Sequence, residues 1–134
     1  MKAENYAKYS ISKLIQIAQK HFNEYIRLRD AGKSCISCGS HAVLEACHYY
    51  SAGNYSGLRF NSMNVHGGCK KCNCFLHGNL IEYRQGLINR YGEKYVKDLE
   101  IQAGIYKRTP MKWDKFELIA IIKECKQDIK LLKK

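Results

Sequence analysis

Two cysteine pairs with C-x-x-C spacing are the residues in this chain whose types and positions most clearly predict chemistry. Cys35 and Cys38 form the first pair, and Cys69 and Cys72 form the second. Four thiolates in two such knuckles can close a tetrahedral zinc site with zinc–sulfur bonds of about 2.3 Å. The alternatives are four buried thiols or a redox pair of the thioredoxin kind, but neither pair stands in a βαβ context. The spacing therefore predicts a structural Zn²⁺.

A histidine and two asparagines stand in a fixed order around these knuckles. His48 and Asn64 lie between the two pairs, and Asn73 directly follows Cys72. A histidine can deprotonate a water, and an asparagine can hold the imidazole in place by a hydrogen bond. Alone, His48 would be taken as a structural histidine, Asn64 as a turn residue and Asn73 as a helix cap. Together they predict a catalytic set of His48, Asn64 and Asn73 that hydrolyses a phosphodiester.

A second, catalytic divalent ion would fit beside these residues. Asn73 offers an amide oxygen at the expected start of a helix, and His77 lies one helical turn later. Oxygen ligands suit Mg²⁺, whereas an imidazole favours softer ions such as Mn²⁺. We expect Asn73, Glu45 and His77 to hold this ion, which would stabilise the attacked phosphate and the leaving oxygen.

The charge of the chain predicts a polyanionic partner. Lys and Arg number 23 against 12 Asp and Glu, which gives a net charge of +11, and ten Tyr and four Phe accompany them. Aromatic rings can stack on bases, so we favour DNA over a membrane surface or mere solubility. No base-reading motif is present, which predicts recognition of shape. The expected DNA-binding residues are Arg59, His66, Lys70, Lys71, Arg84 and Arg90, together with Lys107, Arg108 and Lys112 on a basic loop.

The cysteine content and the hydropathy pattern predict a cytoplasmic protein. No secretory h-region opens the chain, and no apolar run approaches the ~18 residues that a membrane span needs. We therefore interpret the cysteines as reduced, with Cys47, Cys74 and Cys125 as free thiols outside the zinc site.

The elements that must position these residues suggest one domain over residues 1–134. Residues 1–32 are expected to hold an amphipathic helix over 5–31, and residues 33–91 to form the zinc-knuckle core. Residues 92–134 should add C-terminal helices. The predicted fold class is α+β and mainly helical, with a zinc-stabilised ββα centre framed by terminal helices. Within it we expect a strand at 43–50 and an irregular strand, or a strand plus a turn, at 58–66. Helices are expected from Asn73 or Asn79 to Tyr91, at 93–102 and at 114–133, with a loop at 103–112.

Several segments resemble the NinG/Rap family of lambdoid phages. The similarity covers residue 12 to the C-terminus and is densest between 24 and 90. Its motifs are Cys35-Ile-Ser-Cys-Gly, His48-Tyr, Leu58-Arg-Phe-Asn, Asn64-Val-His, Cys69-Lys-Lys-Cys-Asn and Gly78-Asn-Leu-Ile-Glu-Tyr-Arg. The resemblance implies an HNH-like, ββα-metal recombination endonuclease. Such an enzyme would nick branched DNA, including Holliday junctions and D-loops, in the host cell cytoplasm.

Two features depart from that family's pattern. HNH nucleases commonly place an acid directly before the first histidine, where this chain has Cys47. Glu45 shares a strand face with Cys47, so Glu45 or a water would fill the acidic ligand position. Family members also tend to carry a longer basic N-terminal region, so some DNA affinity would be absent or supplied by dimerisation.

Two other functions stay open. One is a zinc-knuckle protein that binds nucleic acid without cleaving it, and the other is an HNH nuclease that acts on linear duplex. A four-way junction is two-fold related, which favours a homodimer. The apolar stripes of 5–31 and 114–133 exceed what one small core should absorb, so one of them is a candidate dimer contact.

Overall fold

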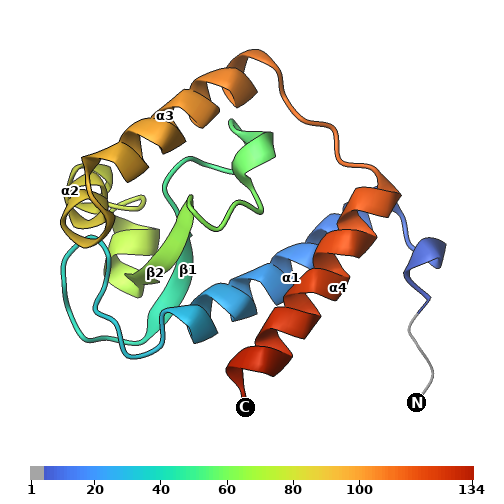
Figure 1. Cartoon of the computed structure of the whole chain (residues 1–134), viewed down its shortest axis with the longest axis horizontal. Coiled ribbons are helices and arrows are strands. Elements are labelled where there is room, and N and C mark those ends of the chain that lie inside the picture. The colour runs from blue at the N-terminus through green and yellow to red at the C-terminus, as the bar shows by residue number, and fades with distance from the viewer. Residues whose placement is uncertain (1–4) are drawn as a thin grey trace.

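The computed structural model describes residues 5–134, which form long helices, two short strands and short helical turns (Figure 1). Their arrangement confirms the expectation of a mainly helical α+β fold with a small two-stranded sheet. The helices and strands are α1 (Ile11–Arg29), β1 (Leu44–His48), β2 (Val65–Cys69), α2 (Leu80–Tyr91), α3 (Glu93–Arg108) and α4 (Lys115–Leu132). The short helical turns are η1 (Tyr6–Lys8), η2 (Ser56–Leu58) and η3 (Lys71–Phe75).

The sheet is a single antiparallel pair that sets the positions of both the cysteines and His48. Leu44 pairs with Cys69 at one end of the ladder, and His48 pairs with Val65 at the other. All five residues of β2 are buried. The first cysteine of the second knuckle therefore ends a buried strand, while His48 lies at the opposite end of the sheet.

The expectation of a strand over all of 58–66 was wrong in its first half. Leu58 ends the turn η2, and the Asn61 N–H donates to the Leu58 carbonyl in a further turn. These local bonds satisfy the backbone, so a ladder does not form before Val65. Gly67 and Gly68, which precede the second knuckle, belong to β2.

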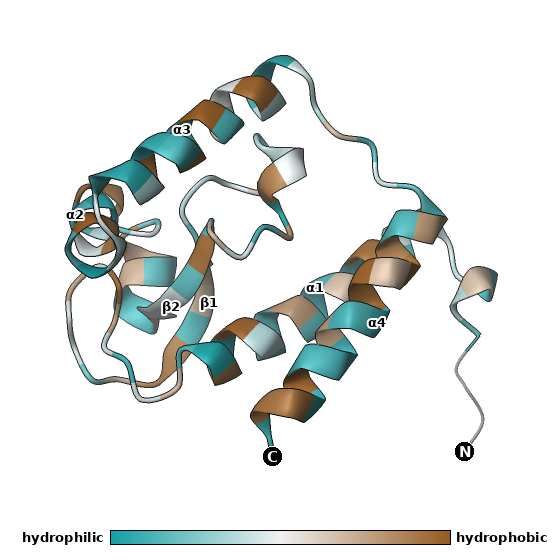
Figure 2. Ribbon diagram, viewed as in Figure 1, coloured by the Kyte–Doolittle hydropathy of each residue, from teal (hydrophilic) through white to brown (hydrophobic). Residues whose placement is uncertain are grey.

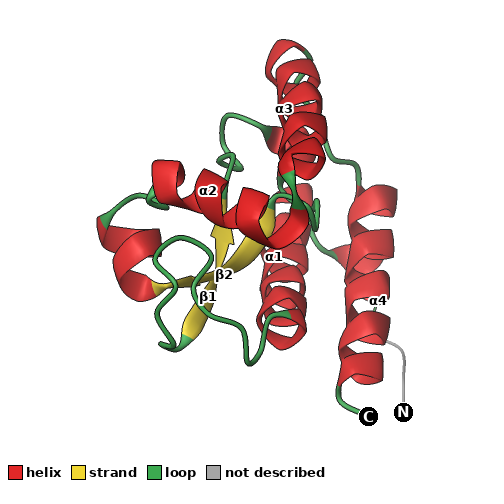
Figure 3. Ribbon diagram, turned by 60° about the vertical axis from the view of Figure 1, so that its left-hand side comes forward, coloured by secondary structure: helices red, strands yellow, loops and turns green. Residues whose placement is uncertain are grey.

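Helices α1 and α4 pack side by side at one end of the molecule, with α1 between the sheet and α4 (Figures 1 and 3). Leu14 and Ala18 of α1 are buried together with Leu118 and Ile122 of α4. Figure 2 shows bands of apolar and polar residues along both helices, as expected of amphipathic elements. The two apolar stripes cover each other, which removes the reason for assigning one of them to a dimer contact.

Helices α2 and α3 form a second core on the other side of the sheet. Tyr83 and Leu87 of α2 pack with Val96 and Leu99 of α3, and the cluster includes Cys47 of β1. The predicted end of α3 near residue 102 was wrong, because Ala103 is buried in this core and the helix continues to Arg108. Only residues 109–114 connect α3 to α4. Among the helices of residues 5–134, none is long and apolar enough to cross a bilayer.

Candidate functional site

The four cysteines of the two knuckles converge on one point. Their sulfur atoms all lie within 4.8 Å of one another, and the Sγ atoms of Cys38 and Cys69 are 3.7 Å apart. Ligands of a tetrahedral zinc with bonds of about 2.3 Å would be about 3.8 Å apart. The Cys35 sulfur also accepts hydrogen bonds from the backbone N–H groups of Cys38 and Cys69, which would stabilise a thiolate. The group could therefore hold a zinc ion.

The other three cysteines lie outside this cluster. Cys47 and Cys125 are buried in the two helical cores, and burial raises the pKa of the Cys47 thiol to about 12 and that of Cys125 to about 11. Cys74 is exposed, and its sulfur lies 3.7 Å from a Glu45 carboxylate oxygen. All seven cysteines fall within residues 5–134 and are free thiols in the structure.

His48 is half-buried at the end of β1, and its ring has a defined tautomer. Its Nε2 atom lies 3.0 Å from the carbonyl oxygen of Arg59. A carbonyl only accepts hydrogen bonds, so Nε2 carries the proton and the lone pair of the neutral ring is on Nδ1. Burial lowers the pKa of His48 below its usual value, and the Arg59 carbonyl opposes this only in part. The imidazole is therefore neutral at neutral pH, as a general base must be.

Asn64 was expected to hold this imidazole and does not. Its side chain is fully buried, donates to the carbonyls of Tyr50 and Leu58, and accepts from the Tyr50 N–H at 2.8 Å. It fastens the two ends of the loop between β1 and η2. The ring of His48 is held instead by the Arg59 carbonyl that follows this loop, so Asn64 acts on His48 through the backbone.

Asn73 and Glu45, both expected to bind a catalytic ion, contact each other. The Asn73 amide donates to a Glu45 carboxylate oxygen at 2.9 Å. This bond leaves the amide oxygen of Asn73 as its available ligand atom. His77 is exposed and has a φ of +50°.

A cavity of about 520 Å³ brings three of the expected site residues together. His48, Asn73 and His77 all line it, and Glu45 is attached to it through Asn73. Three tyrosines form part of its wall, and the ring centroids of Tyr50 and Tyr55 are 4.7 Å apart. Asn64 lies outside the lining. The remaining lining residues are Ser51, Ala52, Asn54, Gly78, Leu80 and Tyr49.

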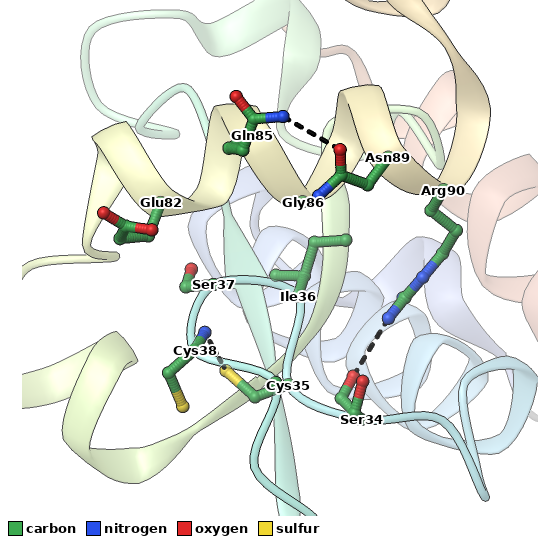
Figure 4. A pocket seen from close by; sticks show the side chains of 11 residues that line it. Ser34, Cys35, Ile36, Ser37, Cys38, Glu82, Gln85, Gly86, Asn89 and Arg90 are labelled. Atoms are coloured by element: carbon green, nitrogen blue, oxygen red, sulfur yellow. Dashed lines mark hydrogen bonds between the residues drawn. The ribbon is translucent and has the colours of Figure 1, made fainter.

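The residues expected to bind DNA differ in their exposure and in whether their charged groups already bind other residues of the chain. Lys70 and Lys71 are exposed beside the second knuckle. The exposed Arg84 pairs with Glu100 of α3 at 3.0 Å. The Arg59 guanidinium donates to Gln19, and Arg90 donates to the Ser34 carbonyl in the first knuckle (Figure 4). Lys107, Arg108 and Lys112 are exposed near the end of α3.

The prediction that His66 contacts DNA was wrong, because its side chain is fully buried. Its two ring nitrogens each lie 3.1 Å from a tyrosine hydroxyl, that of Tyr83 and that of Tyr95. The Tyr83 hydroxyl also donates to the Cys47 carbonyl, and the Tyr95 hydroxyl to the Met63 carbonyl. Burial lowers the pKa of His66 to about 3, so it is a neutral core residue that joins β2 to α2 and α3.

Sequence reasoning missed one polar pair that supports the site. Arg29, at the end of α1, donates twice to the carboxylate of Asp30, which is fully buried. Asp30 also accepts from the Gly67 N–H at 2.8 Å, and Arg29 donates to the Val65 carbonyl. An Arg-Asp pair directly after an amphipathic helix and before a knuckle was the available signal, but similar pairs are common on protein surfaces.

Fold and site together define a small, mainly helical α+β protein with a four-cysteine cluster suited to zinc. Residues 1–134 match the family described as NinG, Bacteriophage Lambda NinG protein, and the chain belongs to that family. This confirms the NinG part of the resemblance seen in the sequence.

Individual relatives agree with this family. The chain is 37% identical over 121 residues to protein ninG of Escherichia phage lambda and 38% identical over 121 residues to that of Salmonella phage P22. Both alignments cover 89% of this chain and 57% of the relative. Protein ninG of Escherichia phage 933W is 42% identical over 88 residues, covering 64% of this chain and 44% of the relative. The chain thus spans about half the length of these relatives. No solved structure matches it.

Proposed function

We propose that the protein is a metal-dependent DNA endonuclease that cuts branched DNA. The observation that carries the proposal is the orientation of His48. Its ring is neutral, its proton is bound to the Arg59 carbonyl through Nε2, and it borders the same cavity as Asn73 and His77. A ring held in this way offers Nδ1 to a water.

His48 would act as the base that removes a proton from the attacking water. As Nδ1 takes up that proton, the Nε2–H bond to the Arg59 carbonyl becomes charge-assisted and stronger. The carbonyl therefore helps to stabilise the imidazolium that forms. Asn64 keeps the loop before Arg59 in place through its bonds to Tyr50 and Leu58, so it is a positioning residue.

Asn73, His77 and Glu45 are the side chains that would hold a divalent ion. A carboxylate, an amide oxygen and an imidazole form a donor set compatible with Mg²⁺ or Mn²⁺. A bound ion would supply positive charge for the phosphate oxygens as the phosphodiester breaks. The Asn73 amide donates a hydrogen bond to the Glu45 carboxylate, which keeps both residues beside the cavity.

The choice of DNA rests on charge and on the aromatic wall of the cavity. The chain has a net charge of +11, and Lys107 approaches the Tyr55 ring to 5.9 Å. Exposed Lys70 and Lys71 lie within the second knuckle, shortly before Asn73 in the sequence. We propose branched DNA as the substrate because the sequence resembles the NinG/Rap recombination proteins and has no base-reading motif. A homodimer acting on a two-fold junction stays a prediction.

The test compares cleavage of a labelled four-way junction with cleavage of linear duplex, in Mg²⁺ and in Mn²⁺. We expect the wild-type protein to cut the junction, and His48→Ala to bind it equally well while cutting at least about a hundredfold more slowly. His41→Ala is the matched control, because His41 is exposed and outside the cavity.

Either of two results would favour another function over the proposed one. Junction binding without cleavage by the wild-type protein in either ion would favour a non-catalytic zinc-knuckle protein. Equal cleavage of linear and branched DNA would favour an HNH nuclease that acts on duplex.

A further inference from the structure

Four large apolar side chains are exposed between residues 75 and 81, the segment that contributes His77, Gly78 and Leu80 to the cavity wall. They are Phe75 (70% exposed), Leu76 (44%), Leu80 (48%) and Ile81 (85%). We call them the apolar ridge. Leu80 also lines the cavity that holds His48, Asn73 and His77, so the ridge and the candidate site are continuous. The Asn79 N–H donates to the Leu76 carbonyl, so one tight turn connects Phe75 and Leu76 to Leu80 and Ile81.

The turn that presents the ridge is backbone-strained and firmly held. His77, Gly78 and Asn79 have φ values of +50°, +91° and +51° in succession. Non-glycine residues rarely adopt this region unless their surroundings impose it. Here the Gly78 carbonyl accepts from Ser37 of the first knuckle at 2.9 Å, and the Asn79 amide lies 3.7 Å from the Cys72 sulfur. Both knuckles therefore hold the turn from which the ridge side chains extend.

The charges around the ridge indicate the chemistry of its partner. Lys70 and Lys71 precede the ridge and are both exposed. Two acids also lie here, Glu82 of α2 and Glu45, whose carboxylate contacts Asn73 and Cys74. Because the chain as a whole carries a net charge of +11, an apolar projection suits a polyanion that also offers apolar flat faces. Nucleic acid presents such faces where its bases are unstacked.

We infer that the apolar ridge packs against unstacked bases at the branch point of the DNA. The inference rests on the proposed function in that DNA is the ligand. At a branch, base stacking is interrupted, so inserting Phe75 or Ile81 there costs less than opening a continuous duplex. The ridge would thus select branched over linear DNA and place the adjoining phosphate at the cavity.

The experiment uses a four-way junction with 2-aminopurine at the branch point and the His48→Ala protein, which should leave the DNA intact. We expect binding to raise 2-aminopurine fluorescence. Adding the substitutions Phe75→Ser and Ile81→Ser to the His48→Ala protein should abolish this rise. Affinity for the junction should fall roughly tenfold, and affinity for linear duplex should stay unchanged.

The matched control is the pair Ile101→Ser and Phe116→Ser, which removes apolar side chains that are 64% and 82% exposed on α3 and α4. This control should behave like the parent protein, and zinc content and melting temperature should agree among all three proteins. A ridge variant with an undiminished fluorescence rise overturns the inference. So does a ridge variant that merely changes from dimer to monomer in sedimentation, because a second copy would then cover the ridge.

The outcomes separate this inference from the proposed nuclease activity. Ridge-dependent fluorescence in a protein whose wild-type form cuts no DNA would keep the inference and reject the nuclease. Cleavage of junctions that is unaffected by the ridge variants would keep the nuclease and reject the ridge.

Discussion

At the residue scale, Asp30 is the point where α1, the sheet and the first knuckle meet. Its carboxylate accepts from Arg29 and from the Gly67 N–H, and the Gly67 carbonyl in turn accepts from the Ile36 N–H in the first knuckle. Burial alone would raise the pKa of Asp30, but the Arg29 and Gly67 hydrogen bonds outweigh it and lower the pKa to about 2. Asp30 is therefore ionised in the folded protein at neutral pH.

Replacing Asp30 by Asn should destabilise the protein by about 3 kcal/mol at pH 7, because it leaves the Arg29 charge without its buried partner. The folded-state pKa lies below the unfolded value, so this contribution is present above about pH 4 and lost as pH falls towards 2. Urea unfolding of both proteins at several pH values measures the difference. The matched control is Asp98→Asn, whose exposed pair with Lys94 should contribute less than about 1 kcal/mol.

The residues of the candidate site show what a sequence can and cannot reveal at this scale. The clustering of the four cysteines and the placement of His48 and Asn73 at one cavity were predictable, because ligand chemistry depends on residue type and spacing. The partners of Asn64 and His66 were not, because each is decided by a backbone carbonyl or a tyrosine hydroxyl that is distant in sequence or unmarked by any motif. A buried histidine and a functional histidine look alike until their neighbours are known.

At the scale of elements, the first knuckle packs directly on α2 through a helical glycine. A Cβ atom at Gly86 would clash with the backbone carbonyl oxygen of Ile36, whereas the nearest side-chain atom is 3.5 Å away. Figure 4 shows Ile36 facing α2 at Gly86, with Arg90 reaching Ser34 one turn further along the helix. This contact fixes the distance between the cysteine cluster and the helix that follows the cavity.

Gly86→Ala should therefore force α2 away from the knuckle and cost about 2 kcal/mol or more. Gly104→Ala is the control, because Gly104 is also in a helix and its Cβ would meet only the Arg108 side chain at 3.7 Å. That substitution should stabilise α3 by about 0.5–1 kcal/mol. Denaturant unfolding of both variants decides the matter, and equal effects of the two would show that the close approach at Ile36 has no energetic weight.

Element types were easier to predict than element ends. The apolar periodicity of residues 5–31 and 114–133 predicted both long helices. The structure places them at 11–29 and 115–132, where Ser10 and Asp114 cap their starts, so the first helix begins later than expected. The end of α3 depended on the burial of Ala103, and the start of β2 depended on the turns before Val65. Both are tertiary effects that local composition does not encode.

At the scale of the whole molecule, the structure contains two helical cores joined through a small sheet and a cysteine cluster. The cores are the α1–α4 pair and the α2–α3 pair. Cys35 follows α1, and Cys72 precedes α2, so a metal at the cluster would connect the chain between the two pairs. Loss of that connection should affect both the fold and the cavity.

Metal analysis of the purified protein should find about one zinc per chain. Cys69→Ser should lose it and fail to give soluble protein, since a structural zinc supplies a large part of the folding free energy. Cys74→Ser is the control, because that thiol is exposed and outside the cluster, and it should keep the metal. A folded wild-type protein without zinc would contradict the assignment.

The pairing of α1 with α4 also has a consequence for how the chain is made. The ribosome delivers α1 first among the long helices, but the face of α1 that α4 covers must wait until residues 115–132 have emerged. The cysteine cluster is complete by Cys72, so the central knuckles can close while that face is still bare. At this stage the nascent chain would expose the apolar face of α1 beside the completed cysteine cluster. Such an exposed apolar face is a target for a chaperone.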